Sequence, residues 1–188
     1  ASPSQMHNHA NVKASELLRL TPAGGQSYGT AMHAMLEQVG FIDEGLPDHD
    51  ALHRAGASSG ATGIDIDQAV DALQKALQQP GAQKLLQRDD ADALWRERRF
   101  MVRMDDRLIA GSFDRVHLWH RNGKPIRALL IDYKTDRVDD TTIDAVVSRY
   151  ADQLRMYRQA LSVMLGLDPS AIQTKLYFVG DDRVIAVG

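Results

Sequence analysis

Residues 128–135 read Ala-Leu-Leu-Ile-Asp-Tyr-Lys-Thr, so four apolar residues precede an aspartate and a lysine. The first four residues form a continuous apolar run, which is typical of a strand that is covered on both faces of a sheet. Asp132 and Lys134 follow two residues apart, so in a strand both side chains project from the same face. We therefore predict a central strand that ends in a carboxylate and an ammonium group.

The simplest explanation of that spacing is a salt bridge at a strand end, but a second aspartate favours another one. Asp114 closes the segment Gly-Ser-Phe-Asp at residues 111–114, on the other side of an Asn122-Gly123 turn. If a hairpin folds around this turn with residue numbers that sum to 246, Asp114 faces Asp132. An even, two-residue turn would place them on opposite faces, so the pairing requires an odd loop or a bulge.

Two carboxylates side by side repel each other unless a proton or a cation lies between them. Hard divalent cations such as Mg²⁺ take oxygen ligands of this kind. The hairpin therefore predicts a metal site formed by Asp114 and Asp132.

The remaining patterns predict an α/β (α+β) fold with a central mixed sheet flanked by helices. Helical spacing covers Thr30–Val39 and about Asp67–Gln79, and Pro80 can open a short third helix. A period of two begins at Trp95 and continues, after a turn at Asp105-Asp106, through residues 107–119. Further along the chain we predict a helix that spans Val146 to Met164 and ends before Gly166, strands over Thr174–Val179 and Arg183–Val187, and a loop over Gly45–Gly63.

Length and composition limit the class of protein. The chain has 188 residues, with 44% hydrophobic and 25% charged residues, which suits one domain with a continuous core and offers no apolar run long enough for a membrane span. Cysteine is absent, which excludes disulfides, thiolate catalysis, zinc fingers and iron–sulfur clusters and fits a cytoplasmic setting. We predict a disordered or tag-like segment at residues 1–14 and a single domain at 15–188, with a helical and loop insertion at about 40–94.

Charge is distributed unevenly along the chain. The formal net charge, counted as the number of Lys and Arg minus the number of Asp and Glu, is −6 for residues 1–95, +5 for 96–137 and −2 for 138–188. The basic middle third could follow a nucleic-acid backbone, although strand alternation limits how many side chains face one groove. Its candidate residues are Arg96, Arg98, Arg99, Arg103, Arg115 and Arg137.

Two helices carry further candidates. His33 lies one residue off the apolar stripe of the first helix, where a lone histidine is usually structural. Gln153 and Tyr157 share one face of the late helix, with Tyr150 one turn earlier, and the alternative is a helix packed by tyrosines. Glu97 could serve a second metal, but ion pairing with its neighbouring arginines explains it more easily.

Together these segments resemble the RecB-like nucleases of the PD-(D/E)xK superfamily, which include the C-terminal nuclease domains of bacterial helicase–nucleases such as RecB and AddA. The resemblance covers about residues 15–187. Four motifs stand in the family's order: Gly29 to His33, Gly111 to Arg115, Ile131 to Thr135, and Tyr150 to Tyr157. The lack of cysteine makes RecB and AddA closer matches than relatives that carry an iron–sulfur cluster.

The resemblance implies a PD-(D/E)xK core and a DNA nuclease that depends on Mg²⁺ or Mn²⁺. It further implies an exonuclease rather than an endonuclease, and a role in DNA repair and recombination in the bacterial nucleoid. It implies an ion held by His33, Asp114, Asp132 and the backbone carbonyl of Tyr133. It assigns catalysis to Asp114, Asp132, Lys134, Gln153 and Tyr157, with Lys134 orienting water or stabilising charge.

DNA, as a single strand or a duplex end, is the implied substrate, and a helicase, as a further domain or a separate protein, is the implied partner. The chain has no phosphate-binding loop of its own, so a motor would lie elsewhere. Two alternatives stay open: a catalytically inactive nuclease-like module that binds DNA or acts as a scaffold, and a metal-free enzyme that uses its paired carboxylates as acid and base.

Overall fold

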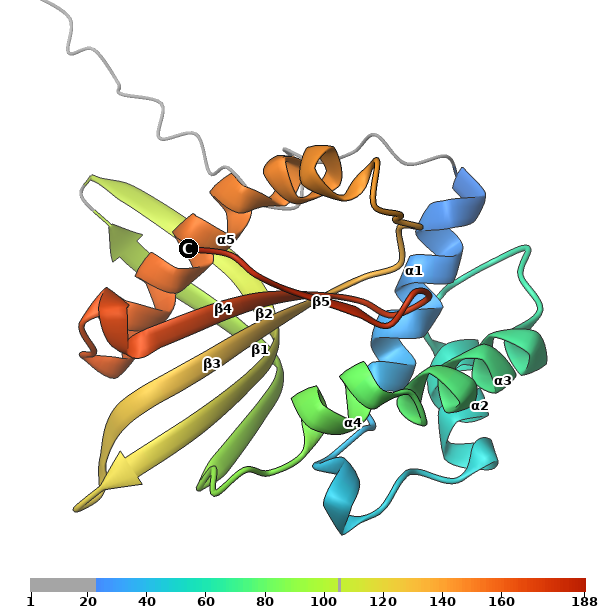
Figure 1. The fold of residues 1–188 in the computed structure, drawn as a ribbon, viewed down its shortest axis with the longest axis horizontal. Coiled ribbons are helices and arrows are strands. Elements are labelled where there is room, and N and C mark those ends of the chain that lie inside the picture. The colour runs from blue at the N-terminus through green and yellow to red at the C-terminus, as the bar shows by residue number, and fades with distance from the viewer. Residues whose placement is uncertain (1–22, 105) are drawn as a thin grey trace, which may run out of the picture.

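A five-stranded mixed sheet carries helices on both faces in the computed structural model, which describes residues 23–104 and 106–188 (Figure 1). The strands pair in chain order: β1 (Ala93–Met104), β2 (Arg107–Arg121), β3 (Lys124–Lys134), β4 (Ile172–Phe178) and β5 (Arg183–Ala186). Only the β3–β4 pair is parallel, and the other three pairs are antiparallel. The prediction of a mixed sheet with β3 at its centre is confirmed.

The helices divide between the two faces of the sheet, and each face has its own apolar core. On one face lie α1 (Ala23–Leu36), α2 (His49–Ser58), α3 (Ile66–Leu77) and α4 (Pro80–Leu86), with the 3-10 turn η2 (Ile42–Glu44) between α1 and α2. On the other face lies α5 (Ile143–Leu165), followed by η3 (Pro169–Ala171). Strand β3 supplies both cores by alternation, with Leu129 and Ile131 on the first face and Ala128 and Leu130 on the second.

The β2–β3 hairpin has the register that the two aspartates require. Asn122 and Gly123 have φ values of 52° and 75° and form a two-residue turn between the paired residues Arg121 and Lys124. The register then shifts between Trp119 and His120, and from there on the paired residue numbers sum to 246, as in Arg115 with Ile131. This irregularity is the bulge that the sequence prediction needed.

Two sequence predictions about helices were wrong. The stretch Gly45–Gly63 is not a loop throughout, because α2 occupies its middle: the Asp48 carboxylate caps this helix by accepting the Ala51 N–H at 2.7 Å. Helix α1 begins at Ala23 rather than Thr30, so Gly29 lies within it. A Cβ on Gly29 would lie 3.3 Å from Thr135 Oγ1, so this glycine lets α1 approach the end of β3.

Arg115 is a structural residue, which corrects its place among the arginines that follow DNA. Its side chain is fully buried, and its guanidinium donates to the carbonyls of Val39, Gly40 and Leu86 and to His117 Nε2. This guanidinium, on strand β2, thereby binds two other parts of the chain: the residues that follow α1 and the last residue of α4.

The first hairpin forms as predicted, with Met104 paired with Arg107, whereas Asp105 of its turn lies outside the described residues. The predicted N-terminal segment at residues 1–14 also lies outside them. Among the described helices, none combines the length and apolarity that crossing a membrane requires.

Candidate active site

A broad cavity of about 1140 Å³ opens where α1 faces strands β1 to β3 and the start of α5. Five elements contribute side chains to it: His33 from α1, Glu97 from β1, Asp114 from β2, Lys134 from β3 and Tyr150 from α5. The fold thus gathers at one place residues that are up to 117 positions apart in the sequence.

His33, Glu97 and Asp114 form a compact group of three. Each offers one ligand atom, and these atoms all lie within 4.8 Å of one another. His33 Nδ1 is 3.6 Å from Asp114 Oδ2 and 3.7 Å from Glu97 Oε1. The other contacts of the two carboxylates hold them in place, because the Tyr133 N–H donates to Asp114 Oδ2 and the Ser112 hydroxyl donates to Glu97 Oε2.

Glu97 adopts a left-handed backbone conformation with φ of 42°, which is rare for a residue with a long side chain. Strand pairing joins Arg96 to Arg115 and Arg98 to Phe113, so Glu97 faces Asp114 but interrupts the ladder. Such strain persists where the surroundings enforce it and is common at functional sites. The prediction that Glu97 pairs with adjacent arginines was wrong: among the described residues its charged partner is His33.

Asp132 and Lys134 project from the same face of β3, as their spacing predicted. Lys134 Nζ is 2.7 Å from Asp132 Oδ2 and 4.0 Å from the centre of the Tyr150 ring, whose hydroxyl donates to Asp136. The contact is close but lacks the angles of a hydrogen bond, so the Asp132 oxygen remains without a hydrogen-bond donor. The salt-bridge interpretation is therefore correct as geometry, and it does not exclude a second role.

Three buried side-chain atoms in the described part of the chain have no hydrogen-bond partner: Asp132 Oδ2, Tyr133 Oη and Gln153 Oε1. Buried polar atoms are nearly always satisfied, and exceptions point to a water, an ion or a ligand. Asp132 Oδ2 already has the Lys134 ammonium at 2.7 Å, and a divalent cation or a water next to it would complete its set of partners. The donor set of carboxylate oxygens and one imidazole suits Mg²⁺ or Mn²⁺.

The ionisation of the cluster reflects its crowding. Burial raises the pKa of Asp114 to about 7, the His33 charge lowers it and the Asp132 charge adds to the rise. Burial alone would lower the pKa of His33, but the nearby carboxylates, Asp114 foremost, outweigh it and raise the pKa to about 9. Burial likewise opposes the charge of Lys134, yet Asp132 holds its pKa above the usual value. The charges of His33 and Lys134 thus offset part of the negative charge of these carboxylates.

The remaining predicted residues lie around this centre. Tyr157 packs edge-on against Phe100 and Phe113 in the core, and burial, with the charges of Asp132 and Asp114, raises its pKa to about 12. Tyr157 therefore fits the alternative of a helix packed by tyrosines while it stays within the field of the site. The Tyr133 side chain points away from Lys134 into the other core, next to Tyr177.

Sequence and fold together place the chain in a known class. A family model described as the PD-(D/E)XK nuclease superfamily matches residues 8–185, and the chain belongs to this superfamily. Two similar proteins both carry the name of an ATP-dependent helicase/nuclease subunit. The relative from Clostridium acetobutylicum is 21% identical over 188 positions, and the relative from Streptococcus sanguinis is 27% identical over 176. These alignments cover 88% and 87% of this chain but only 14% and 13% of the relatives.

Proposed function

We propose that the chain is the nuclease domain of a bacterial helicase–nuclease and hydrolyses phosphodiester bonds of DNA with Mg²⁺ or Mn²⁺. One observation carries the proposal: three ligand atoms from His33, Glu97 and Asp114 lie within 4.8 Å of one another beside a buried aspartate–lysine pair. Superfamily membership supports nuclease chemistry at this place.

In this proposal His33 and Asp114 hold the ion, and Glu97, Asp132 and the Tyr133 carbonyl complete its oxygen ligands. A divalent ion at such a site polarises the phosphoryl oxygen and lowers the pKa of bound water. The protein contributes rigid placement, since the Tyr133 N–H fixes Asp114 at 2.8 Å and both groups belong to paired strands.

Lys134 places a positive charge where negative charge develops on the phosphate. Its ammonium is held between Asp132 and the Tyr150 ring and needs little rearrangement during the reaction. Gln153 and Tyr157 support it from α5, and the free Gln153 oxygen can accept a hydrogen bond from water. Catalysis thus rests on Asp114, Asp132, Lys134, Gln153 and Tyr157.

DNA would reach the site along the exposed arginines of β1. Arg99 lines the same cavity as His33, and its charge can hold a backbone phosphate without reading sequence. The chain covers about a seventh of its helicase/nuclease relatives, so the proposed motor lies on the remaining length of such a protein or on a partner. Delivery of a strand by a motor fits exonuclease action in DNA repair and recombination at the nucleoid.

Cleavage of end-labelled DNA tests the proposal. We expect cutting with Mg²⁺ or Mn²⁺, none in excess EDTA, and binding with little cutting in Ca²⁺, which is larger and acidifies water less. Undiminished cutting in EDTA would support the metal-free acid–base alternative. Metal binding without any cutting would support the inactive module.

A further inference from the structure

A second cavity, of about 520 Å³, lies between α4 and the strands β2, β3 and β4. His117 and Leu129 line this cavity on the face of the sheet that α4 covers. His117 is three residues from Asp114 along β2, and Leu129 is three residues from Asp132 along β3. The nuclease site described above uses none of the residues that line this second cavity. Its size falls within the range of small-molecule and cofactor sites, roughly 300–1,000 Å³.

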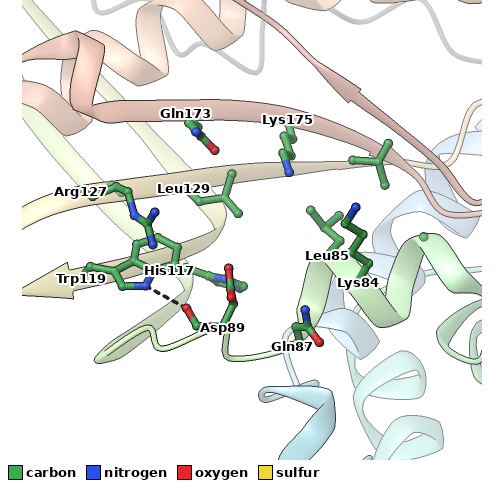
Figure 2. A pocket seen from close by; sticks show the side chains of 13 residues that line it. Lys84, Leu85, Gln87, Asp89, His117, Trp119, Arg127, Leu129, Gln173 and Lys175 are labelled. Carbon is green, nitrogen blue, oxygen red and sulfur yellow. Dashed lines mark hydrogen bonds between the residues drawn. The ribbon is translucent and has the colours of Figure 1, made fainter.

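The lining carries more positive than negative charge. The cavity is lined by three cations and one carboxylate, which leaves two positive charges in excess: Lys84 on α4, Lys175 on β4, Arg127 on β3 and Asp89. Within residues 23–104 and 106–188, none of these three cations comes within 4.0 Å of a carboxylate oxygen. Figure 2 shows the side chains of Lys84 on α4 and Lys175 on β4 pointing into the space between these two elements. An anion that lay between the two ammonium groups would be attracted by both of them.

His117, on the cavity wall, responds to the same field. Burial, followed by the charges of Arg115 and Lys175, lowers the pKa of this imidazole to about 3. The ring is therefore neutral, and because its Nε2 accepts from Arg115 at 2.7 Å, its proton resides on Nδ1. His117 therefore contributes a buried, neutral side chain to this wall and adds no negative charge to it.

The other walls suit a flat group with donors of its own. Trp119 carries Arg127 at 3.9 Å over its ring and donates its indole N–H to the Asp89 carbonyl at 3.0 Å. The Asp89 carboxylate next to it is an acceptor for N–H groups (Figure 2). Apolar surface comes from Leu85 and Leu129. A ligand that matches all walls has an anion at one end and an N–H-bearing aromatic ring at the other.

We propose that this cavity binds a nucleotide, with the phosphate between Lys84 and Lys175 and the base beside Trp119 and Asp89. The nucleotide is either a free mononucleotide or one unit of a DNA strand. The phosphate contact is the same in both cases, and binding does not depend on the nuclease reaction.

Trp119 fluorescence tests the site directly. A Trp95→Phe background leaves Trp119 as the only tryptophan, because the chain has two. The titrants are dCMP, inorganic phosphate and a phosphorothioate oligodeoxycytidine, all with EDTA present, so that failure of the proposed nuclease activity would not affect the result. We expect saturable quenching by dCMP or by the oligomer. A response to dCMP identifies a free nucleotide as a ligand, and a response to the oligomer alone identifies a strand.

Charge variants show where the ligand binds. The double variant Lys84→Gln/Lys175→Gln should raise the dissociation constant at least tenfold, whereas Lys75→Gln, an exposed lysine on α3 away from the cavity, should change it less than twofold. Circular dichroism and melting temperature verify that each variant folds, and Lys84→Gln alone serves if the double variant does not. The proposal is overturned if neither nucleotide quenches, if phosphate alone binds as tightly as dCMP, or if the double variant binds like its parent.

Discussion

Lys134 has the same sign of charge as a metal ion, and this separates its role from that of the aspartates beside it. Asp114→Ala and Asp132→Ala each remove an anionic oxygen, so we expect both metal affinity and cleavage to fall. Lys134→Ala leaves Asp132, only 3% exposed, without its cation, so Mn²⁺ affinity should persist or increase while cleavage falls by about 10² to 10³.

Calorimetric Mn²⁺ titration and single-turnover cleavage at saturating metal measure the two effects separately. Cleavage by Lys134→Ala within about threefold of the parent, a barrier change of less than roughly 1 kcal/mol, would leave Lys134 as a strand-end ion pair.

Glu97 allows a test of whether the site stores backbone strain. In an ordinary strand Gly is less stable than Ala by roughly 0.5–1 kcal/mol, whereas a left-handed residue with a Cβ costs about 1–2 kcal/mol. At φ of 42° we therefore expect the Glu97→Gly variant to be more stable than the Glu97→Ala variant. Both lack the carboxylate, so both should bind Mn²⁺ more weakly than the parent.

Urea unfolding of the two Glu97 variants measures the difference, with Arg98→Gly and Arg98→Ala as the matched pair one residue further along β1. If Ala is more stable than Gly at both positions, Glu97 is not strained in the folded protein.

At the scale of elements, Gly111 sets how closely β2 approaches β1 and α5. A Cβ there would lie 2.8 Å from Phe100 Cζ and 3.3 Å from the Tyr157 ring. Gly111→Ala must displace the Phe100 ring and, with it, the Tyr157 ring that packs edge-on against it, so we expect a loss of about 1–3 kcal/mol of stability together with weaker cleavage.

The control for this variant is Gly40→Ala, where a Cβ meets nothing within 4 Å. Chemical denaturation should show a change there of no more than about 1 kcal/mol. Equal effects at the two glycines would mean that the Phe100 contact does not limit the packing of β2.

The elements that were predictable from sequence are those whose pattern is local. The apolar run of β3 and the Asn122-Gly123 turn show period and turn chemistry directly, and they fix the sheet centre and the hairpin. Helix α2 was missed because it buries only Leu52 and Gly56, too few apolar positions to reveal a helical period.

Residues whose role depends on distant partners were not predictable. Glu97 meets His33 across 64 positions of sequence, and only its backbone conformation, invisible in the sequence, directs it there. By residue type alone, Arg115 could not be told from the exposed arginines of β1. It is buried because three backbone carbonyls from other parts of the chain accept hydrogen bonds from its guanidinium.

For the molecule as a whole, the buried pair of Arg115 and His117 makes the free energy of unfolding depend on pH. The His117 imidazole accepts the Arg115 Nε–H, and protonation would both end this hydrogen bond and place two cations together. The folded pKa of His117 is about 3, whereas an unfolded histidine has a pKa of about 6.5. The unfolded chain therefore binds the proton first, and stability that is fully present above pH 6.5 is lost as the pH falls toward 3.

At pH 5 this linkage costs about 2 kcal/mol. The comparison protein is His117→Gln, whose amide oxygen can accept from Arg115 but cannot take up a proton. We expect the variant to be less stable than the parent at pH 7.5, and to lose about 2 kcal/mol less on going to pH 5, because the titration of all other groups is common to both proteins. Urea denaturation at the two pH values gives both differences. Equal losses in the two proteins would mean that the pKa of His117 is the same in the folded and the unfolded chain, and that the Arg115–His117 pair does not make stability depend on pH.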